Sequence, residues 1–247
     1  MTRAAAVKTG SPSASRWNAA VLWEYFNRSE RPLTSLIFVG PLLLIYEFGT
    51  HYFSGGVLAV AWVHDFLSFF GATGRYLPAL TVVIILLCWH IARRDGWDVN
   101  PLHLAGMLLE SLILAVPLLL ICMVAATYLP MAAESEPMPG LLTRSIGAGI
   151  YEELVFRLGA FSLLSFVLVD LLKVRKTRAT IAMVVIASLA FSLYHYWGNE
   201  PFRVRTFVFR TVAGIYFGVV FAFRGFGISA GSHSAYDVIV HLLRAAG

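Results

Sequence analysis

Long apolar runs dominate the sequence and restrict the chain to a small number of folds. A helix needs roughly 20 predominantly apolar residues to cross a bilayer. Segments of about this length lie at residues 33–50, 77–92, 102–130, 142–172, 179–197, 206–223 and 228–244. Of the 247 residues 58% are apolar and 13% charged, about half the charge of a typical soluble domain. The sequence therefore predicts an all-α, polytopic helical membrane protein with about seven transmembrane helices.

One further apolar stretch, "GGVLAVAWVHDFLSFFGATG" at residues 55–74, is shorter than these segments. Glycines bound it, and His64 and Asp65 interrupt it. Counting it as a full span would put Arg93 and Arg94 outside the cell, against the tendency of basic residues to remain inside. We therefore expect a short re-entrant or interfacial helix.

Charged residues outside the spans predict the orientation and the division of the chain. With the N-terminus in the cytoplasm, most lysines and arginines fall in inner segments, and the outer loops include the acidic "AAESEPMPG". This distribution accounts for the net charge of +5 without a nucleic-acid partner. We expect a cytoplasmic tail and interfacial helix at 1–32, N-terminal transmembrane helices at 33–141 and a separate C-terminal transmembrane core at 142–247. The plasma membrane is the expected location.

The stretch "GAGIYEELVFRLGAF" places Glu152, Glu153 and Arg157 inside an apolar run. Charges within a membrane segment are costly and by default indicate function. Glu153 and Arg157 are four residues apart on one helix face, in the favourable order for an ion pair. Glu152 is rotated by about 100° from Glu153 and has no partner within its own helix. The alternatives are a carboxylate that faces a polar cavity and a packing network that joins helices.

Two histidine-containing stretches follow in the C-terminal half. "FSLYHYW" contains His195, and "GSHSAYDVIVHLL" places His233, Asp237 and His241 along one helix face. A carboxylate and histidines can activate a water molecule and stabilise an oxyanion. The set Glu152, His195 and His233 could equally form a zinc site with an open position, although the sequence has no HExxH motif.

Three motifs in order resemble one family. "EELVFR" fits EExxxR, "FSLYH" fits FxxxH, and "HSAYD" fits HxxxN/D. The segment 142–244 thereby resembles the CPBP family, the intramembrane proteases related to the CAAX prenyl endopeptidase Rce1 and to bacteriocin self-immunity proteins. The resemblance implies an intramembrane endopeptidase that cuts a membrane-anchored or lipidated protein or peptide.

The resemblance also implies roles for the motif residues. Glu152 and His195 would activate the attacking water, and His233 with residue 237 would stabilise the oxyanion. Glu153 and Arg157 would form a structural ion pair that holds the site together. The glutamic-type mechanism, without a cofactor, is favoured, and a divalent metal such as zinc is the alternative.

Position 237 departs from the prenyl-processing branch, which has Asn where this chain has Asp237. An ionised carboxylate cannot donate a hydrogen bond to an oxyanion. The alternatives are that Asp237 orients His233, is held neutral, or binds a metal. Of these, orientation of His233 is the favoured prediction.

The depths in the membrane that are expected for the motif residues conflict with placing them at one site. Glu152 and His195 are expected toward the outer side of the membrane, whereas His233 comes early in the last helix and is expected toward the inner side. The mismatch approaches about 15 Å at 1.5 Å per residue. Tilt, a broken helix or a penultimate helix that starts later would remove it, and the glycine-rich "RGFGISAGSH" is a place where such a break is expected.

Two other classes of protein remain compatible with buried acids and histidines. A proton-coupled transporter could use them as a relay, and a catalytically silent partner or immunity protein could retain the fold alone. Neither an inverted repeat nor paired broken helices are evident in the sequence, which counts against transport. Glu47 and Glu110, two further acids in apolar runs, are expected to pair with a basic residue or histidine.

Overall fold

The computed structural model describes residues 14–53, 56–126, 137–197 and 200–246. All regular elements in these ranges are helical, which confirms the predicted fold class. Five helices are long and apolar enough to cross a membrane by length and composition. They span Pro32–Tyr52, Pro101–Val124, Met138–Leu171, Lys176–Trp197 and Val204–Ala246. Residues 1–13 of the predicted cytoplasmic tail and most of "AAESEPMPG" lie outside the described residues.

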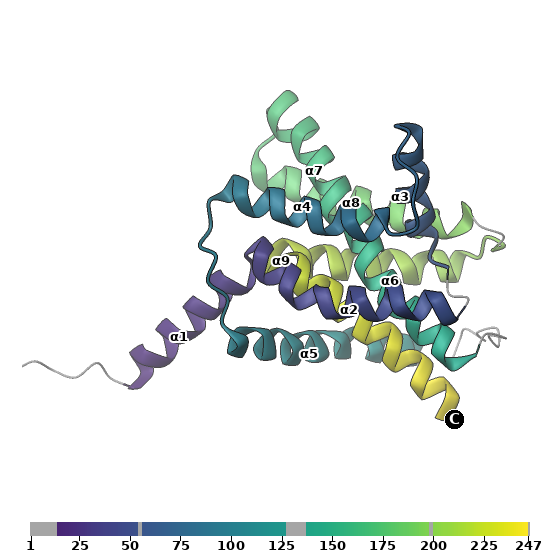
Figure 1. Ribbon diagram of the computed structural model, residues 1–247, viewed down its shortest axis with the longest axis horizontal. Coiled ribbons are helices and arrows are strands. Elements are labelled where there is room, and N and C mark those ends of the chain that lie inside the picture. The colour runs from purple at the N-terminus through teal and green to yellow at the C-terminus, as the bar shows by residue number, and fades with distance from the viewer. Residues whose placement is uncertain (1–13, 54–55, 127–136, 198–199, 247) are drawn as a thin grey trace, which may run out of the picture.

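The N-terminal half forms an incomplete bundle of helices (Figure 1). It comprises α1 (Ala14–Ser29), α2 (Pro32–Tyr52), α3 (Leu58–Phe69), α4 (Leu77–Arg93) and α5 (Pro101–Ala126). At 12 residues α3 is about 18 Å long, too short to cross a bilayer, as predicted for this stretch. With 17 residues α4 is slightly shorter than a typical span. The α1 helix projects away from the bundle at the end where α4 connects to α5.

The helix that carries the paired glutamates is continuous but irregular. It begins as α6 (Met138–Glu153) and continues as the π-helical η1 (Leu154–Gly159), α7 (Ala160–Ser165) and the π-helical η2 (Phe166–Leu171). Turns with π geometry are rare in proteins, and many of those that do occur lie at functional sites. Sequence analysis predicted a regular helix here, because apolar length and periodicity carry no signal for the hydrogen-bond shift of a π turn.

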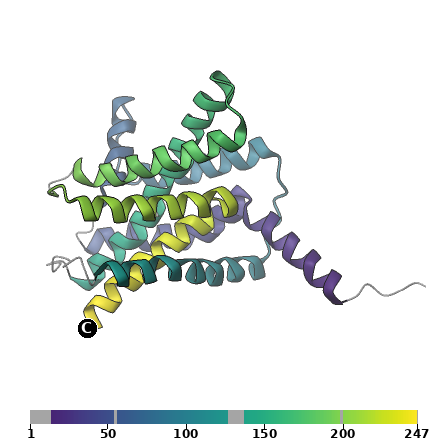
Figure 2. The same ribbon diagram turned by 180° about the vertical axis from the view of Figure 1, so that it is seen from behind.

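The last two predicted spans are the two arms of one bent element. After α8 (Lys176–Tyr194) and the short 3-10 turn η3 (His195–Trp197), α9 runs over Val204–Ala246. Gly225 interrupts it with φ 73° and ψ −174°, a backbone conformation that favours glycine. The arms at 204–224 and 226–246 fold back on each other there, and the first arm lies between α8 and α5 (Figure 2). The predicted break in the glycine-rich stretch is therefore confirmed.

One apolar core joins the two halves of the chain. Buried Val39 and Leu43 of α2 pack in the same cluster as Ile150 and Tyr151 of α6. Gly149 allows α6 to approach the second arm of α9 closely, since an added Cβ would come within 2.5 Å of the backbone nitrogen of Ser234. This close contact places the end of α6, with Glu152 and Glu153, beside the beginning of the second arm, with His233.

Candidate active site

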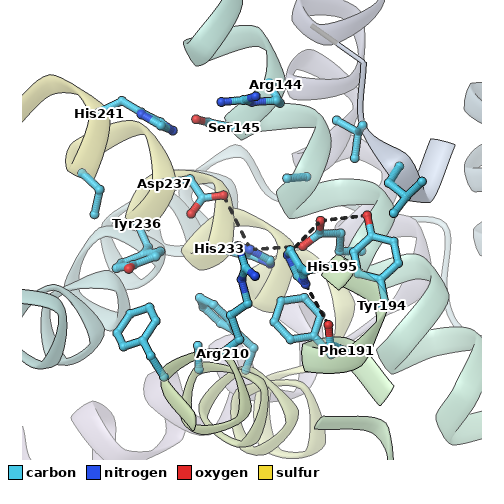
Figure 3. A pocket seen from close by; sticks show the side chains of 18 of the residues that line it. Arg144, Ser145, Phe191, Tyr194, His195, Arg210, His233, Tyr236, Asp237 and His241 are labelled. Carbon is cyan, nitrogen blue, oxygen red and sulfur yellow. Dashed lines mark hydrogen bonds and ion pairs between the residues drawn. The ribbon is translucent and has the colours of Figure 1, made fainter. Parts of the chain in front are cut away.

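A cavity of about 520 Å³ lies where α6, α8 and the two arms of α9 meet. Glu152 at the end of α6, His195 at the end of α8 and His233 on the second arm of α9 all line it. Asp237, one turn after His233, lines it as well, so the cavity contains all four predicted catalytic residues (Figure 3). Sequence reasoning thus identified residues that the fold brings together from distant positions.

Glu152 is almost completely buried, with 5% of its surface exposed, and its two oxygens face different neighbours. Oε1 accepts a hydrogen bond of 3.1 Å from the hydroxyl of Tyr194 and lies 3.9 Å from Nε2 of His195. Oε2 lies 3.7 Å from Nε2 of His233. The distances to the imidazoles exceed that of a direct hydrogen bond. The carboxylate and both ring nitrogens therefore retain the capacity to bind a water molecule or a substrate group.

Glu153 faces away from this space and is held by three partners. Its Oε1 lies 3.1 Å from Nη1 of Arg157 and 2.9 Å from Nδ1 of His233, and its Oε2 accepts a 2.6 Å hydrogen bond from Ser229. Glu153 has no exposed surface, so these contacts replace the water that the carboxylate loses on burial. The structure contains the expected ion pair and adds Ser229 and His233 to it.

Arg157 is 1% exposed and connects the ion pair to two other helices. Its Nη2 donates a 3.1 Å hydrogen bond to the carbonyl of Gly214 on the first arm of α9. Its guanidinium lies 4.7 Å from the ring centroid of Phe191, the first residue of the FxxxH motif. The phenylalanine of that motif thus packs against the arginine of the EExxxR motif.

The hydrogen bonds of His195 indicate which ring nitrogen faces the cavity. Its Nδ1 is 2.8 Å from the carbonyl oxygen of Phe191. Because a carbonyl only accepts, Nδ1 is the donor, and in the neutral ring Nε2 has a free lone pair. This nitrogen is the one directed at Glu152, so His195 can accept a proton beside the carboxylate.

His233 is held between an aromatic ring and two carboxylates. Phe217 stacks on it with centroids 4.4 Å apart and an interplanar angle of 15°. Nδ1 contacts Glu153, while Nε2 lies 3.7 Å from Asp237 Oδ2 on the cavity side. The closest carboxylate partner of the ring is therefore Glu153 rather than Asp237, which was predicted to orient it. The role of Asp237 stays a prediction.

The expected depth mismatch between Glu152 and His233 is wrong. The count placed the two about 15 Å apart, whereas Glu152 Oε2 and His233 Nε2 are 3.7 Å apart. The sharp reversal at Gly225 explains the difference, because it leaves no loop between the arms. His233 lies eight residues after this glycine and stacks on Phe217, eight residues before it. The second arm thus returns into the bundle immediately.

Several contacts of the site were not anticipated. Tyr194 precedes the motif histidine, yet an apolar run gives no indication that its hydroxyl reaches Glu152. Ser229 lies in the glycine-rich stretch, where serine is common for reasons of packing. Arginines also line the cavity, and Arg210 forms a bidentate pair with Glu200 at 2.8 and 3.0 Å. Partners contributed by other helices depend on the tertiary fold, and local spacing does not report them.

The residues proposed as ligands of an alternative metal centre were Glu152, His195 and His233. Across the part of the chain that the structure describes, no group of three His, Cys, Asp or Glu side chains has an arrangement suited to holding a metal ion. Instead, Oε1 of Glu152 is hydrogen-bonded to Tyr194, and Nδ1 of His233 is hydrogen-bonded to Glu153.

The fold and the cavity together define a multi-pass helical membrane protein with a buried carboxylate–histidine site. Residues 134–239 match the family model described as type II CAAX prenyl endopeptidase Rce1-like. The match covers all three motifs and confirms the resemblance over this segment. The family is one of proteases, which supports a CAAX-type endopeptidase in general terms. Searches of curated proteins and of solved structures found no match.

Proposed function

We propose that this protein is an intramembrane endopeptidase that hydrolyses a peptide bond of a membrane-anchored or lipidated protein or peptide by a glutamic-type mechanism. The observation that carries the proposal is the convergence of Glu152, His195 and His233 at one cavity. Each residue belongs to a different helix, and each directs an oxygen or nitrogen atom with remaining hydrogen-bonding capacity toward the others.

In this mechanism Glu152 and the Nε2 lone pair of His195 bind a water molecule and remove its proton as its oxygen attacks the peptide carbonyl. General-base catalysis by a positioned side chain contributes typically about 10²–10⁴-fold. The same proton is then delivered to the leaving amine, which completes hydrolysis without a net change in the protein. The carboxylate of Glu152 is suited to act as the base because Arg157 forms its ion pair with Glu153.

His233 supports the developing negative charge on the carbonyl oxygen. Its Nδ1 donates to Glu153, so a proton on Nε2 makes the ring an imidazolium with a donor directed into the cavity. Glu152, Glu153 and Asp237 surround the ring and favour a cationic form electrostatically. In this proposal Asp237 acts through His233 rather than on the substrate.

The orientation of the protein in the membrane and the membrane in which it resides are also part of the proposal. The α1 helix, the α4–α5 connection and the reversal at Gly225 lie at one end of the bundle (Figure 1). Arg93, Arg94 and Arg224 are at this end. The positive-inside rule assigns such an end to the cytoplasm. We propose that the N-terminus is cytoplasmic and that the protein resides in the plasma membrane.

A comparison of protein termini in membranes tests the function directly. Cells produce either the wild-type protein or Glu152→Gln, and new termini are identified in both by mass spectrometry. We expect specific termini to disappear with Glu152→Gln and to persist with the matched control Glu47→Gln, a carboxylate that does not line the cavity. Identical profiles from two folded, expressed proteins would contradict proteolysis and direct attention to transport or partner binding.

Chelation separates the two mechanisms. Once a cleaved peptide has been identified, the purified protein is assayed after treatment with a metal chelator. The glutamic-type mechanism predicts unchanged hydrolysis. Loss of hydrolysis that added zinc restores would instead assign catalysis to a metal held at the same residues.

A further inference from the structure

Tyr194 is the one hydroxyl that contacts the proposed catalytic carboxylate among the hydrogen bonds of the described residues. Its oxygen donates to Glu152 Oε1 at 3.1 Å. This hydrogen bond restrains the position of Oε1 relative to His195 and His233. The tyrosine side chain is 2% exposed, so its ring is enclosed by protein.

The ring of Tyr194 is held by aromatic neighbours from two other elements. Trp62 of α3 packs on it edge to face, with centroids 5.0 Å apart at 84°. Phe156 of the π-helical segment lies 5.1 Å away at 64°. Trp62 and Phe156 are also within 6.3 Å of each other, so the three rings form a closed group. A shift of α3 would therefore move the ring whose hydroxyl holds Glu152.

The α3 helix comes from outside the segment that matches the protease family, residues 134–239. It also borders the cavity, because Val57 and Leu58 at its beginning line it. The farther part of the helix is exposed: Phe66 is 65% and Phe69 is 83% exposed. One end of α3 is thus packed against the site and the other end projects from the bundle (Figure 1).

We propose that Tyr194 is a positioning residue for Glu152 and that Trp62 fixes Tyr194 in place, so that α3 determines how the carboxylate is aimed. This proposal rests on the function proposed above and adds a contribution from the N-terminal half of the chain. It assigns a role in catalysis to a short helix that does not itself carry a reacting group.

Kinetics of four variants test the coupling. The substrate is a peptide that spans a cleavage site identified by the comparison of termini. We expect Tyr194→Phe to lower kcat by about 10- to 100-fold, the effect of losing a hydrogen bond to a charged group, with KM within about twofold. Trp62→Leu should lower kcat by about 3- to 10-fold through lost aromatic packing. Phe66→Leu, on the same helix but away from Tyr194, is the matched control and should leave kcat unchanged.

The double variant Trp62→Leu/Tyr194→Phe distinguishes positioning from a general loss of stability. If Trp62 acts through the tyrosine hydroxyl, the double variant should be no slower than Tyr194→Phe alone, because the contact that Trp62 supports is already gone. Multiplied effects on kcat, or an unchanged kcat in Tyr194→Phe, would overturn the proposal. Thermal unfolding of each purified variant in detergent shows that the comparison is made between folded proteins.

A second readout does not depend on hydrolysis. A hydrophobic carbodiimide modifies buried carboxyl groups, and mass spectrometry distinguishes Glu152 from its neighbour Glu153. We expect Tyr194→Phe and Trp62→Leu to change the modification rate of Glu152 severalfold, with Glu153 unchanged. If these rates change but the wild-type protein cleaves nothing, positioning stands and the proposed function fails. If cleavage depends on Glu152 but neither rate nor kcat responds to Tyr194→Phe, positioning alone fails.

Discussion

The arginine–glutamate networks around Arg157 and Arg224 use their charges differently. In the network beside the cavity, Arg157 binds Glu153, whereas the adjacent Glu152 faces Tyr194 and the two histidines. In the second network, at the reversal of α9, Arg224 contacts Glu110 through two nitrogens, at 2.5 and 2.9 Å. A further nitrogen of Arg224 lies 3.2 Å from Glu30, which directly follows α1.

Both carboxylates of the second network, Glu110 and Glu30, contact Arg224. Tyr25 donates a 2.5 Å hydrogen bond to the same Glu110 carboxylate that Arg224 binds, and Ser29 accepts one of 2.8 Å from Arg224. The expected basic partner of Glu110 is thereby confirmed. This network attaches α1 to α5 and α9 and does not line the cavity. The two networks differ in that Arg224 contacts both carboxylates of its network, whereas Glu152 keeps an oxygen without a hydrogen bond, and the function proposed for Glu152 rests on this difference.

The largest expected effect is the loss of hydrolysis when Glu152, the carboxylate that does not pair with Arg157, is replaced. Glu152→Gln removes the proposed base but keeps an oxygen that can accept from Tyr194. We expect hydrolysis of the identified peptide to fall by at least about 10²-fold, in the range of general-base catalysis. Thermal unfolding should remain close to wild type. Glu110→Gln is the matched control in the other network and should reverse the pattern, with stability lowered and hydrolysis retained.

Substitution of Arg157 should affect folding instead. Arg157→Gln leaves Glu153 buried without its arginine partner, and breaking a buried ion pair costs about 3–5 kcal/mol. Unfolding of the purified protein by a denaturing detergent measures this loss. The double variant Glu153→Gln/Arg157→Gln should recover part of it, because no uncompensated charge remains. A double variant as unstable as Arg157→Gln would show that the packing of Arg157, rather than its charge, holds the helices.

Arg224→Gln should have a smaller effect that is confined to the other end of the bundle. Glu30 and Glu110 are partly exposed, so water replaces some of the lost contacts. We expect a destabilisation of about 1–3 kcal/mol, the value of hydrogen bonds to charged groups. Limited proteolysis should cut between α1 and α2 faster than in wild type, while the rate of peptide hydrolysis stays within about threefold. Protection of α1 equal to wild type would contradict this assignment.

Asp237→Asn tests whether the second carboxylate of the cavity must be ionised for hydrolysis. An amide retains the size of the side chain, and His233 remains bound to Glu153. We expect the variant to keep much of its activity, with kcat within about tenfold of wild type, the effect of about 1.4 kcal/mol. Steady-state kinetics on the same peptide measures it. Complete loss from a folded variant would show that an ionised carboxylate is needed at this position.

The smallest effect belongs to Asp98, a surface acid between α4 and α5. A hydrogen bond from its own backbone lowers the pKa of Asp98, and nearby Arg28 and Arg31 lower it further. Since the folded protein has the lower pKa, this contribution to stability is present above the ordinary value of about 3.9 and is lost as pH falls through the folded value. Thermal unfolding of Asp98→Asn and wild type should therefore differ no more at pH 9 than at pH 6. A difference that grows across this range would contradict the assignment.

Apolar length predicted most of the fold, because each span must satisfy its own backbone in lipid. The motif spacing predicted the ion pair of Glu153 with Arg157 and grouped Glu152 with both histidines. The depth of His233 was mispredicted, because a count of residues cannot show that Gly225 reverses the chain without a loop. The hydroxyl of Tyr194 was also missed, since its contact depends on how α8 packs against α6.

The order in which the chain is made gives the pairing of Glu153 with Arg157 another consequence. The hydroxyl and imidazole that bind Glu153 come from residues 76 and 80 positions later, and the carbonyl that binds Arg157 comes 57 positions later. A ribosome therefore releases α6 to the membrane while those partners are still unsynthesised. During that interval a lone charge would cost about 2.5–3.5 kcal/mol on insertion. Arg157, one turn away from Glu153, is already present, so these two charges can enter the bilayer as a pair before the later helices supply the other contacts.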